Sequence, residues 1–514
     1  MFESIKPHHI WKRLPSLVAA ACAFFMLACV PLVFRNALFD INRIKVDVIL
    51  AAAPVFALAC ALSFVIKRGR PALCTEAAVP CALLLCFALA AVISAARQGF
   101  DSSVLLGADG RQCGLYFLLA CVCLFFVIAI GGIKGNRIAA CACVAAAVVA
   151  VLGVLNAVGI DPLGFYARMQ KGQEHLFLST IGNIDFFGCY LALMLPIAAG
   201  GCIHAASRHE ACFYLLLSVC IILGVAASRS DSAMLAVQLG MLVLLVLSGE
   251  SWAQMAKVLF LWALSFSALP VMYSRFLTVR FFLPLSGIFL ALCQKPFAWA
   301  AFFLLCALSG LCCLAHAKHR GGPGVRRLAL ASAAALAAAA ALLLGAMVYF
   351  TVYAPDAELG ALSSFLRFDD HWGTRRGFVY RRCLRAFVGF SPMDRLFGQG
   401  VDRTRHILAP YFDDPAMLVY GTFNDAHCQV LQYLLTTGLI GAGSLAAFHV
   451  IMLVGLTRSS RRETRMSGFC AALYAYTPIA LLNVSQPILI ASYLSVCAVA
   501  VSGMQHLAAK EANP

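Results

Sequence analysis

About fifteen apolar runs, each roughly as long as a bilayer is thick, follow one another along this chain and limit its fold more than any other feature. They lie at about 14–34, 46–66, 77–96, 114–133, 138–159, 186–204, 211–227, 231–248, 256–273, 280–294, 296–316, 327–350, 434–456, 467–483 and 487–506. Backbone N–H and C=O groups find no water inside lipid, so a crossing segment must bond within itself, as a helix does. The runs therefore predict an all-α, polytopic integral membrane protein.

Composition points the same way. Hydrophobic residues make up 62% of the 514 residues, charged residues 12%, and the mean hydropathy is +0.88. So much apolar surface has no soluble core large enough to hide it, and membrane lipids are the expected surroundings. The 39 Lys and Arg against 23 Asp and Glu fit the excess of positive charge that membrane proteins keep in their cytoplasmic loops. No nucleic-acid partner is expected.

Cysteines and phosphate-binding motifs give little support for metal or cofactor chemistry. The 23 cysteines fall mainly inside apolar runs, where a free thiol behaves as a small hydrophobe. Spacings such as Cys141-Ala142-Cys143 do not suit zinc, and no disulfide framework is expected. There is no P-loop and no dinucleotide-binding glycine motif. We predict no metal site and no cofactor.

Basic clusters between the runs predict the topology. Clusters at 67–70, 134–137, 208, 318–327 and 458–465 all become cytoplasmic if 280–294 is an interfacial segment that does not span. The run at 14–34, which follows basic residues, is expected to be a first membrane helix that is retained. About fourteen crossings with both termini cytoplasmic follow. We expect a bundle at 1–350 (about twelve crossings), an extracytoplasmic loop with short helices at 351–426, further membrane helices at 427–506 and a cytoplasmic tail at 507–514. The other outer loops are 97–113, 160–185, 228–230 and 484–486.

The loop at 351–426 has nine Arg, no Lys and nine acidic residues. A guanidinium binds phosphate through two parallel N–H bonds, so the loop suggests a phosphate-bearing ligand, with a compositional preference for Arg and ordinary ion pairs as alternatives.

Residues 372–387 predict a helix after a Thr374 cap, with Arg376, Tyr380, Cys383 and Phe387 on one face. Arg376 then lies on the apolar stripe, where it binds an anionic substrate or forms a salt bridge to Asp369 or Asp370.

His427 stands where this loop meets the next long apolar helix. Asn424 or Asp425 is expected to cap that helix and so place the imidazole at the membrane surface. A group that titrates near neutral pH there is a candidate for proton transfer to or from a lipid-borne substrate. On the same side, Arg229 links two apolar runs and either faces the cavity under the loop, reaches to headgroups or pairs with Asp231.

Short motifs spread in order along the chain resemble the O-antigen ligase and polymerase superfamily, in its Gram-positive-type form. They are GADGRQCGL at 107–115, TIGN at 180–183, SRS at 228–230, WGTRRG at 372–377, LFGQG at 396–400, AH at 426–427, LQYL at 431–434 and GLIG at 438–441. The family commonly has Asn after the histidine, whereas this chain has Cys428. Either Arg375 or Arg376 could correspond to the family's arginine.

The resemblance implies a metal-independent glycosyltransferase that takes a glycan from an undecaprenyl-pyrophosphate carrier at the outer face of the bacterial cytoplasmic membrane. The acceptor is a separate glycan or lipid in a ligase and another lipid-linked repeat in a polymerase. Matching by motif, Arg229 and Arg376 would hold the pyrophosphate, and His427 would take the proton of the acceptor hydroxyl. Further residues expected to contact substrate are Arg375, Tyr380, Arg111, Asn183 and Asp425. The alternative functions are a flippase or transporter of lipid-linked glycans, and a membrane protein whose outer loop recruits glycan enzymes.

Overall fold

The computed structural model describes residues 7–35, 41–68, 73–133, 135–169, 172–248, 251–275, 296–318, 323–411 and 423–512. The N-terminal half contains α1 (Pro7–Phe24), continued by a π-helix (Phe25–Cys29) and a 3-10 helix (Val30–Leu32), then α2 (Ile41–Lys67), α3 (Thr75–Arg97), α4 (Ser102–Leu106), α5 (Leu115–Ile130), α6 (Gly135–Ala157), α7 (Ile184–Ile203), α8 (Arg208–Ser228) and α9 (Asp231–Leu247). Between α6 and α7 lie two 3-10 helices (Tyr166–Arg168, Glu174–Leu176) and a hairpin of β1 (Phe177–Leu178) and β2 (Gly182–Asn183).

The C-terminal half contains α10 (Trp252–Arg275), α12 (Phe297–Ala317) and α13 (Pro323–Val352). Next come the short elements of the loop: a 3-10 helix (Gly360–Leu362), α14 (Ser363–Leu366), α15 (Trp372–Val388), α16 (Pro392–Phe397), α17 (Thr404–Leu408) and a 3-10 helix (Ala409–Tyr411). Then follow α19 (Gln429–Arg462), a 3-10 helix (Thr464–Met466), α20 (Ser467–Leu482) and α21 (Pro487–Ala512).

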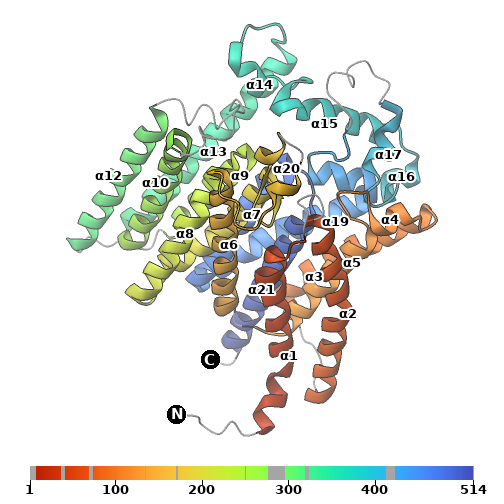
Figure 1. The fold of residues 1–514 in the computed structure, drawn as a ribbon. Coiled ribbons are helices and arrows are strands. Elements are labelled where there is room, and N and C mark those ends of the chain that lie inside the picture. The colour runs from red at the N-terminus through yellow and green to blue at the C-terminus, as the bar shows by residue number, and fades with distance from the viewer. Residues whose placement is uncertain are drawn as a thin grey trace.

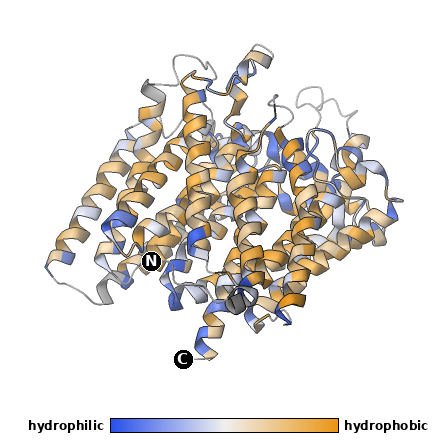
Figure 2. Ribbon diagram, turned by 60° about the horizontal axis from the view of Figure 1, so that its bottom comes forward, coloured by the Kyte–Doolittle hydropathy of each residue, from blue (hydrophilic) through white to orange (hydrophobic). Residues whose placement is uncertain are grey.

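The long helices form one bundle of membrane-spanning type. Among the described residues, 11 helices are long and apolar enough to cross a bilayer, the first at Arg13–Leu32, and α5 and α9 are shorter apolar helices. Hydrophobic residues cover the middle of the helices, and hydrophilic residues gather towards their ends and in the loops (Figure 2). The all-α, polytopic fold class is confirmed. The number of crossings, their orientation and the domain boundaries remain predictions, and the segment 280–294 lies outside the described residues.

The predicted outer loops meet at one end of the bundle. Arg111 in the first loop bonds to Asp402 and Asp425 in the large loop, and Asp185 accepts a hydrogen bond from Ser230. The Cys113 thiol lies 3.8 Å from the carbonyl of Ser485. The start of α1 and the end of α21 lie at the opposite end of the bundle, away from α14 and α15 (Figure 1). These contacts join 97–113 to 351–426 and to 484–486, and they join 160–185 to 228–230; that all five loops lie on the outer face stays a prediction.

The large loop is joined to the bundle by a close approach of two backbones. A Cβ on Gly398 would lie 2.3 Å from the carbonyl carbon of Thr436, and a Cβ on Gly438 would lie 2.3 Å from backbone atoms of Leu396. Both glycines have positive φ, 75° and 69°. Gly438 also breaks the regular course of α19, which consists of two helical segments joined at this residue. Only glycine meets both demands, the conformation and the absence of a side chain.

We expect Gly398→Ala to destabilise the protein by about 1–3 kcal/mol, because the new Cβ collides with backbone and the residue keeps a left-handed conformation. Thermal unfolding in detergent measures the change. The matched control is Gly443→Ala in α19, where a Cβ would meet nothing within 4 Å. Equal unfolding temperatures for the two variants would contradict the proposed role of this contact.

Candidate functional site

His427 lies in a turn whose backbone is held on both sides. Its φ is 51°, a conformation that is uncommon outside glycine. Its N–H donates to Asp425 Oδ1 at 2.6 Å, and its carbonyl lies 2.9 Å from the hydroxyl of Tyr380. Helix α19 begins at Gln429, with Cys428 as the N-cap and no side-chain cap. The prediction that Asn424 or Asp425 caps this helix is wrong, because the Asp425 carboxylate bonds to the turn before it.

Arg111 holds this turn in place through an ion pair with Asp425. Its Nε donates to Asp402 Oδ1 at 2.9 Å and its Nη1 donates to Asp425 Oδ2. All three side chains are buried. Burial alone would lower the pKa of Arg111, but the two carboxylates raise it above its ordinary value. The structure therefore shows Arg111 and Asp425 as partners of each other, and their predicted contact with substrate stays a prediction.

Two further contacts complete the support of the turn. The second oxygen of Asp402 accepts the N–H groups of Ala108 at 2.9 Å and Cys113 at 3.2 Å. In α19, Gln432 Oε1 accepts the N–H of Ala426 at 3.1 Å and the hydroxyl of Thr404 at 2.8 Å. The backbone before His427 is thus tied to the first turn of the helix after it.

Helix α15 presents the predicted face to this turn. Cys383 is buried, and Tyr380 and Phe387 pack against the same small core, which is formed by the loop and α19. Arg376 is partly buried on this side, whereas Arg375 is exposed, with a φ of 73°. The helical phase predicted for this segment is confirmed. Its start is Trp372, so Thr374 lies inside the helix and is not the N-cap.

The salt bridge considered as an alternative for Arg376 is absent from the described residues. Asp370 pairs instead with Arg381 at 3.0 Å and Arg382 at 2.9 Å. Arg376 Nη1 donates to the carbonyl of Gly373 at 2.8 Å, and its buried Nε has no hydrogen-bond partner in the described part of the chain. The guanidinium of Arg376 therefore has an N–H group available to donate to a ligand.

Arg229 lies at the C-terminal end of α8, in the short connection to α9. It is the C-cap of α8 in a left-handed conformation, and burial lowers its pKa. The next residue, Ser230, donates its hydroxyl to Asp185 Oδ1 at 2.6 Å. Asn183 caps α7 by accepting the N–H of Asp185 at 2.9 Å. Asn183 is thus the N-cap of α7, and its contact with substrate stays a prediction.

The burial of His427 favours a neutral imidazole. Burial is the main cause that lowers its pKa below the ordinary value of 6.5; Arg376 and Arg111 lower it further, while Asp425 and Asp185 act in the opposite direction. Burial raises the pKa of Tyr380, so its hydroxyl stays protonated. A neutral imidazole has one ring nitrogen free to accept a proton.

Three residues near these groups escaped the sequence analysis as functional candidates: Asp185, Asp402 and Asn483. Asp185 and Asp402 have the contacts given above, and Asn483 Nδ2 donates to Cys189 Sγ at 2.8 Å, one turn along α7 from Asp185. Asp185 follows the TIGN motif by two residues and Asp402 follows LFGQG by two, which was the available signal. No group of three or more His, Cys, Asp and Glu side chains suited to a metal occurs in the described ranges.

Fold and site together define a multi-pass membrane protein with a histidine and cationic side chains gathered at one end of its helix bundle. Residues 281–446 match the family model of O-antigen ligase, which confirms the resemblance to the O-antigen ligase and polymerase superfamily. The match includes Arg376 and His427, while Arg111, Asn183 and Arg229 precede it. No curated protein matches the sequence. Over this segment the chain is similar to membrane glycan ligases of the O-antigen type.

Replacing Arg111 by Met should destabilise the protein by about 3–5 kcal/mol, because two buried carboxylates lose their cation. Arg381→Met is the matched control, since the Arg381 side chain is 47% exposed in its ion pair with Asp370 and its loss should cost about 1 kcal/mol or less. Thermal unfolding of the two variants in detergent tests this. A similar, small decrease in both unfolding temperatures would show that the buried pairs do not hold the loop.

Proposed function

We propose that this protein transfers a glycan from an undecaprenyl-pyrophosphate carrier to a hydroxyl acceptor at the outer face of the bacterial cytoplasmic membrane, in the assembly of a cell-surface polysaccharide. The observation that carries the proposal is that a buried imidazole with a lowered pKa, His427, lies within electrostatic range of Arg376, a guanidinium that forms no ion pair among the described residues. Both residues lie inside the segment that matches O-antigen ligase. The imidazole can take the proton that the acceptor hydroxyl must lose. The guanidinium can stabilise the negative charge that the leaving pyrophosphate gains.

The proposed reaction requires no added cofactor or metal. The acceptor oxygen attacks the anomeric carbon of the donor sugar, the bond from that carbon to the phosphate oxygen breaks, and undecaprenyl pyrophosphate leaves with the electron pair. His427 accepts the hydroxyl proton as general base. Arg376 and Arg229 stabilise the pyrophosphate as its charge develops. The acceptor is a separate glycan or lipid, or another lipid-linked repeat.

Between the two adjacent arginines, the geometry favours Arg376 as the pyrophosphate ligand. Its charge acts on His427, and it lies on the packed face of α15. Arg375 is exposed and is assigned a supporting role at the rim. Tyr380 holds the His427 turn through its hydroxyl. Asn183 acts by fixing the start of α7 and so the carboxylate of Asp185.

A transporter of lipid-linked glycans remains the competing function. It would move the intact donor across the membrane without breaking the bond to the pyrophosphate. The two functions are separated by the product, since only transfer releases free undecaprenyl pyrophosphate.

The purified protein in detergent, given a lipid-linked glycan and an acceptor with chelator and no nucleotide, should release undecaprenyl pyrophosphate. His427→Ala should slow this release by about a hundredfold or more, because the general base is lost. Arg376→Lys should also be slow, since an ammonium lacks the two-pronged contact with phosphate. Chromatography of the lipid product measures the rates.

Arg381→Lys is the control for Arg376→Lys, because it conserves charge on the same helix at an exposed site. It should transfer at the wild-type rate. Equal release by wild type and His427→Ala would exclude the catalytic assignment. Absence of release by the wild type, with uptake of the lipid-linked glycan across vesicles, would favour the transporter.

The dependence of transfer on pH should follow the lowered pKa of His427. A base with a pKa below 6.5 is neutral at pH 7, so activity should be lost only when the pH falls below that lowered value. Asp185→Asn removes a negative charge that raises this pKa, so the acidic limb of kcat/KM should move to lower pH. Asp356→Asn, at an exposed position of the large loop, should leave the limb in place. A limb that moves upward in Asp185→Asn would contradict the assignment.

A further inference from the structure

An apolar cavity of about 140 Å³ lies between α19, α20 and α21, directly below the His427 turn. It exists because α19 changes direction at Gly438. Residues before this break (Gln429, Val430 and Tyr433) and after it (from Ala442 to Val450) both contribute to the lining, so the cavity fills the wedge that the break opens against α20.

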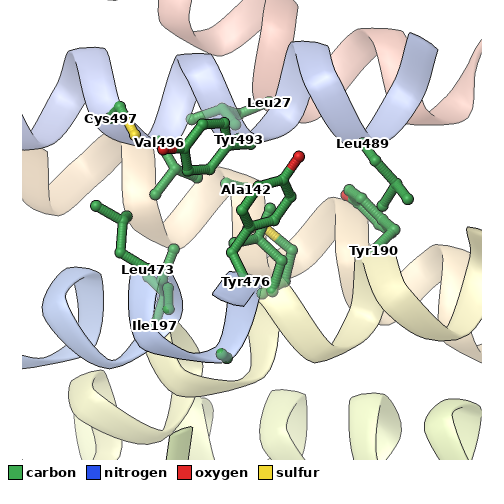
Figure 3. Close-up of a cluster of buried hydrophobic side chains, with 14 of the residues drawn as sticks. Leu27, Ala142, Tyr190, Ile197, Leu473, Tyr476, Leu489, Tyr493, Val496 and Cys497 are labelled. Atoms are coloured by element: carbon green, nitrogen blue, oxygen red, sulfur yellow. The ribbon is translucent and has the colours of Figure 1, made fainter. Parts of the chain in front are cut away.

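The walls of the cavity are apolar and aromatic, and the residues at its rim are exposed on the outside of the helix bundle. The rings of Tyr476 and Tyr493 stack at 3.9 Å between centroids, with 8° between their planes. These two residues lie beside each other in the packed cluster of Figure 3. At the rim, Val430, Val450 and Leu481 are 42%, 55% and 44% exposed. In a helix of the membrane-spanning type, such a rim opens onto hydrocarbon.

The polar groups in the cavity are already bonded to the protein. The ring nitrogens of His449 lie 2.8 Å from the Tyr493 hydroxyl and 3.0 Å from the Thr477 hydroxyl. The Tyr476 hydroxyl donates to Gln429 at 3.2 Å. A ligand in the cavity therefore need not supply hydrogen bonds, and a hydrocarbon chain can occupy it without leaving these polar groups unpaired.

The upper end of the cavity adjoins the candidate site. Gln429 lines it and is only two residues from His427. Leu481 also lines it, and its carbonyl lies 2.6 Å from the Tyr380 hydroxyl, the same hydroxyl that contacts the His427 carbonyl. A lipid whose phosphates lie beside His427 could thus pass its chain into this wedge without crossing a polar layer.

We propose that the wedge between α19, α20 and α21 binds the first part of the polyisoprenoid chain of the lipid-linked substrate. This inference rests on the proposed function, since that function supplies a substrate with such a chain. An apolar cavity of about this size can enclose a small hydrocarbon such as benzene, so it accommodates a short stretch of the chain, with the remainder in the bilayer.

The test measures binding without transfer, by native mass spectrometry of the full chain with undecaprenyl pyrophosphate, farnesyl pyrophosphate or phosphatidylglycerol. Ala446→Phe fills the wedge from α19, and Ala480→Phe fills it from α20. Each should weaken binding of undecaprenyl and farnesyl pyrophosphate about tenfold, because the burial of a few methylene-sized groups is lost. Gly443→Phe, one turn from Ala446 and facing open space, should leave the binding of both unchanged. Elution as a single folded species in detergent is required of each variant.

Unchanged binding of both pyrophosphates in the two filled variants would overturn the inference. A loss confined to phosphatidylglycerol would also overturn it, since the wedge would then hold an acyl chain of bulk lipid. Because these measurements need no acceptor, a protein that binds the chain in the wedge but transfers nothing would contradict the proposed function alone.

Discussion

The buried cation of Arg111, placed between the carboxylates of Asp402 and Asp425, is the interaction on which the geometry of the site depends. Taking one charge out of water is costly, and the cost is offset only when each partner stays in place. The pairs join residues 291 and 314 positions apart in the sequence. The loop before α5, the loop after α16 and the turn before α19 can therefore occupy only one mutual arrangement.

This arrangement explains how His427 keeps its left-handed backbone. Such a conformation persists when the surroundings determine it more than once. Here Asp425 binds the N–H of His427, Tyr380 contacts its carbonyl, and Gln432 accepts the N–H of the residue before it. The backbone at His427 is thereby held by three contacts, which come from the turn itself, from α15 and from α19.

None of the ion pairs described in the large loop includes Arg376. Asp402 and Asp425 share Arg111, and Asp370 shares Arg381 and Arg382. Of the two carboxylates considered as partners of Arg376, Asp370 thus binds other cations, and Asp369 accepts the N–H of His371. All basic residues of the loop apart from histidine are arginines, and they divide into two groups: Arg381 and Arg382 hold Asp370, whereas Arg376 is the one that the proposed function assigns to phosphate.

The sequence predicted what the bilayer and the helical period dictate. The apolar runs predicted the helices, and the spacing of Arg376 and Tyr380 predicted the face of α15 that packs against the loop core. It did not predict the caps of α15 and α19, since Thr374 and Asp425 have good capping chemistry but other structural positions. It also missed Asp185 and Asp402, whose roles come from contacts with distant residues that no local pattern contains.

Helix α19 links the chemistry of the site to its lipid surroundings through one residue. Gly438 lets the loop approach α19 at Gly398, and the same left-handed residue turns the second half of the helix so that the wedge opens towards the bilayer. His427 lies in the turn that immediately precedes the first half. The contact that seats the loop and the space suited to a hydrocarbon chain therefore arise from a single backbone conformation, so the polar and apolar ends of a lipid-linked substrate would be placed by the same helix.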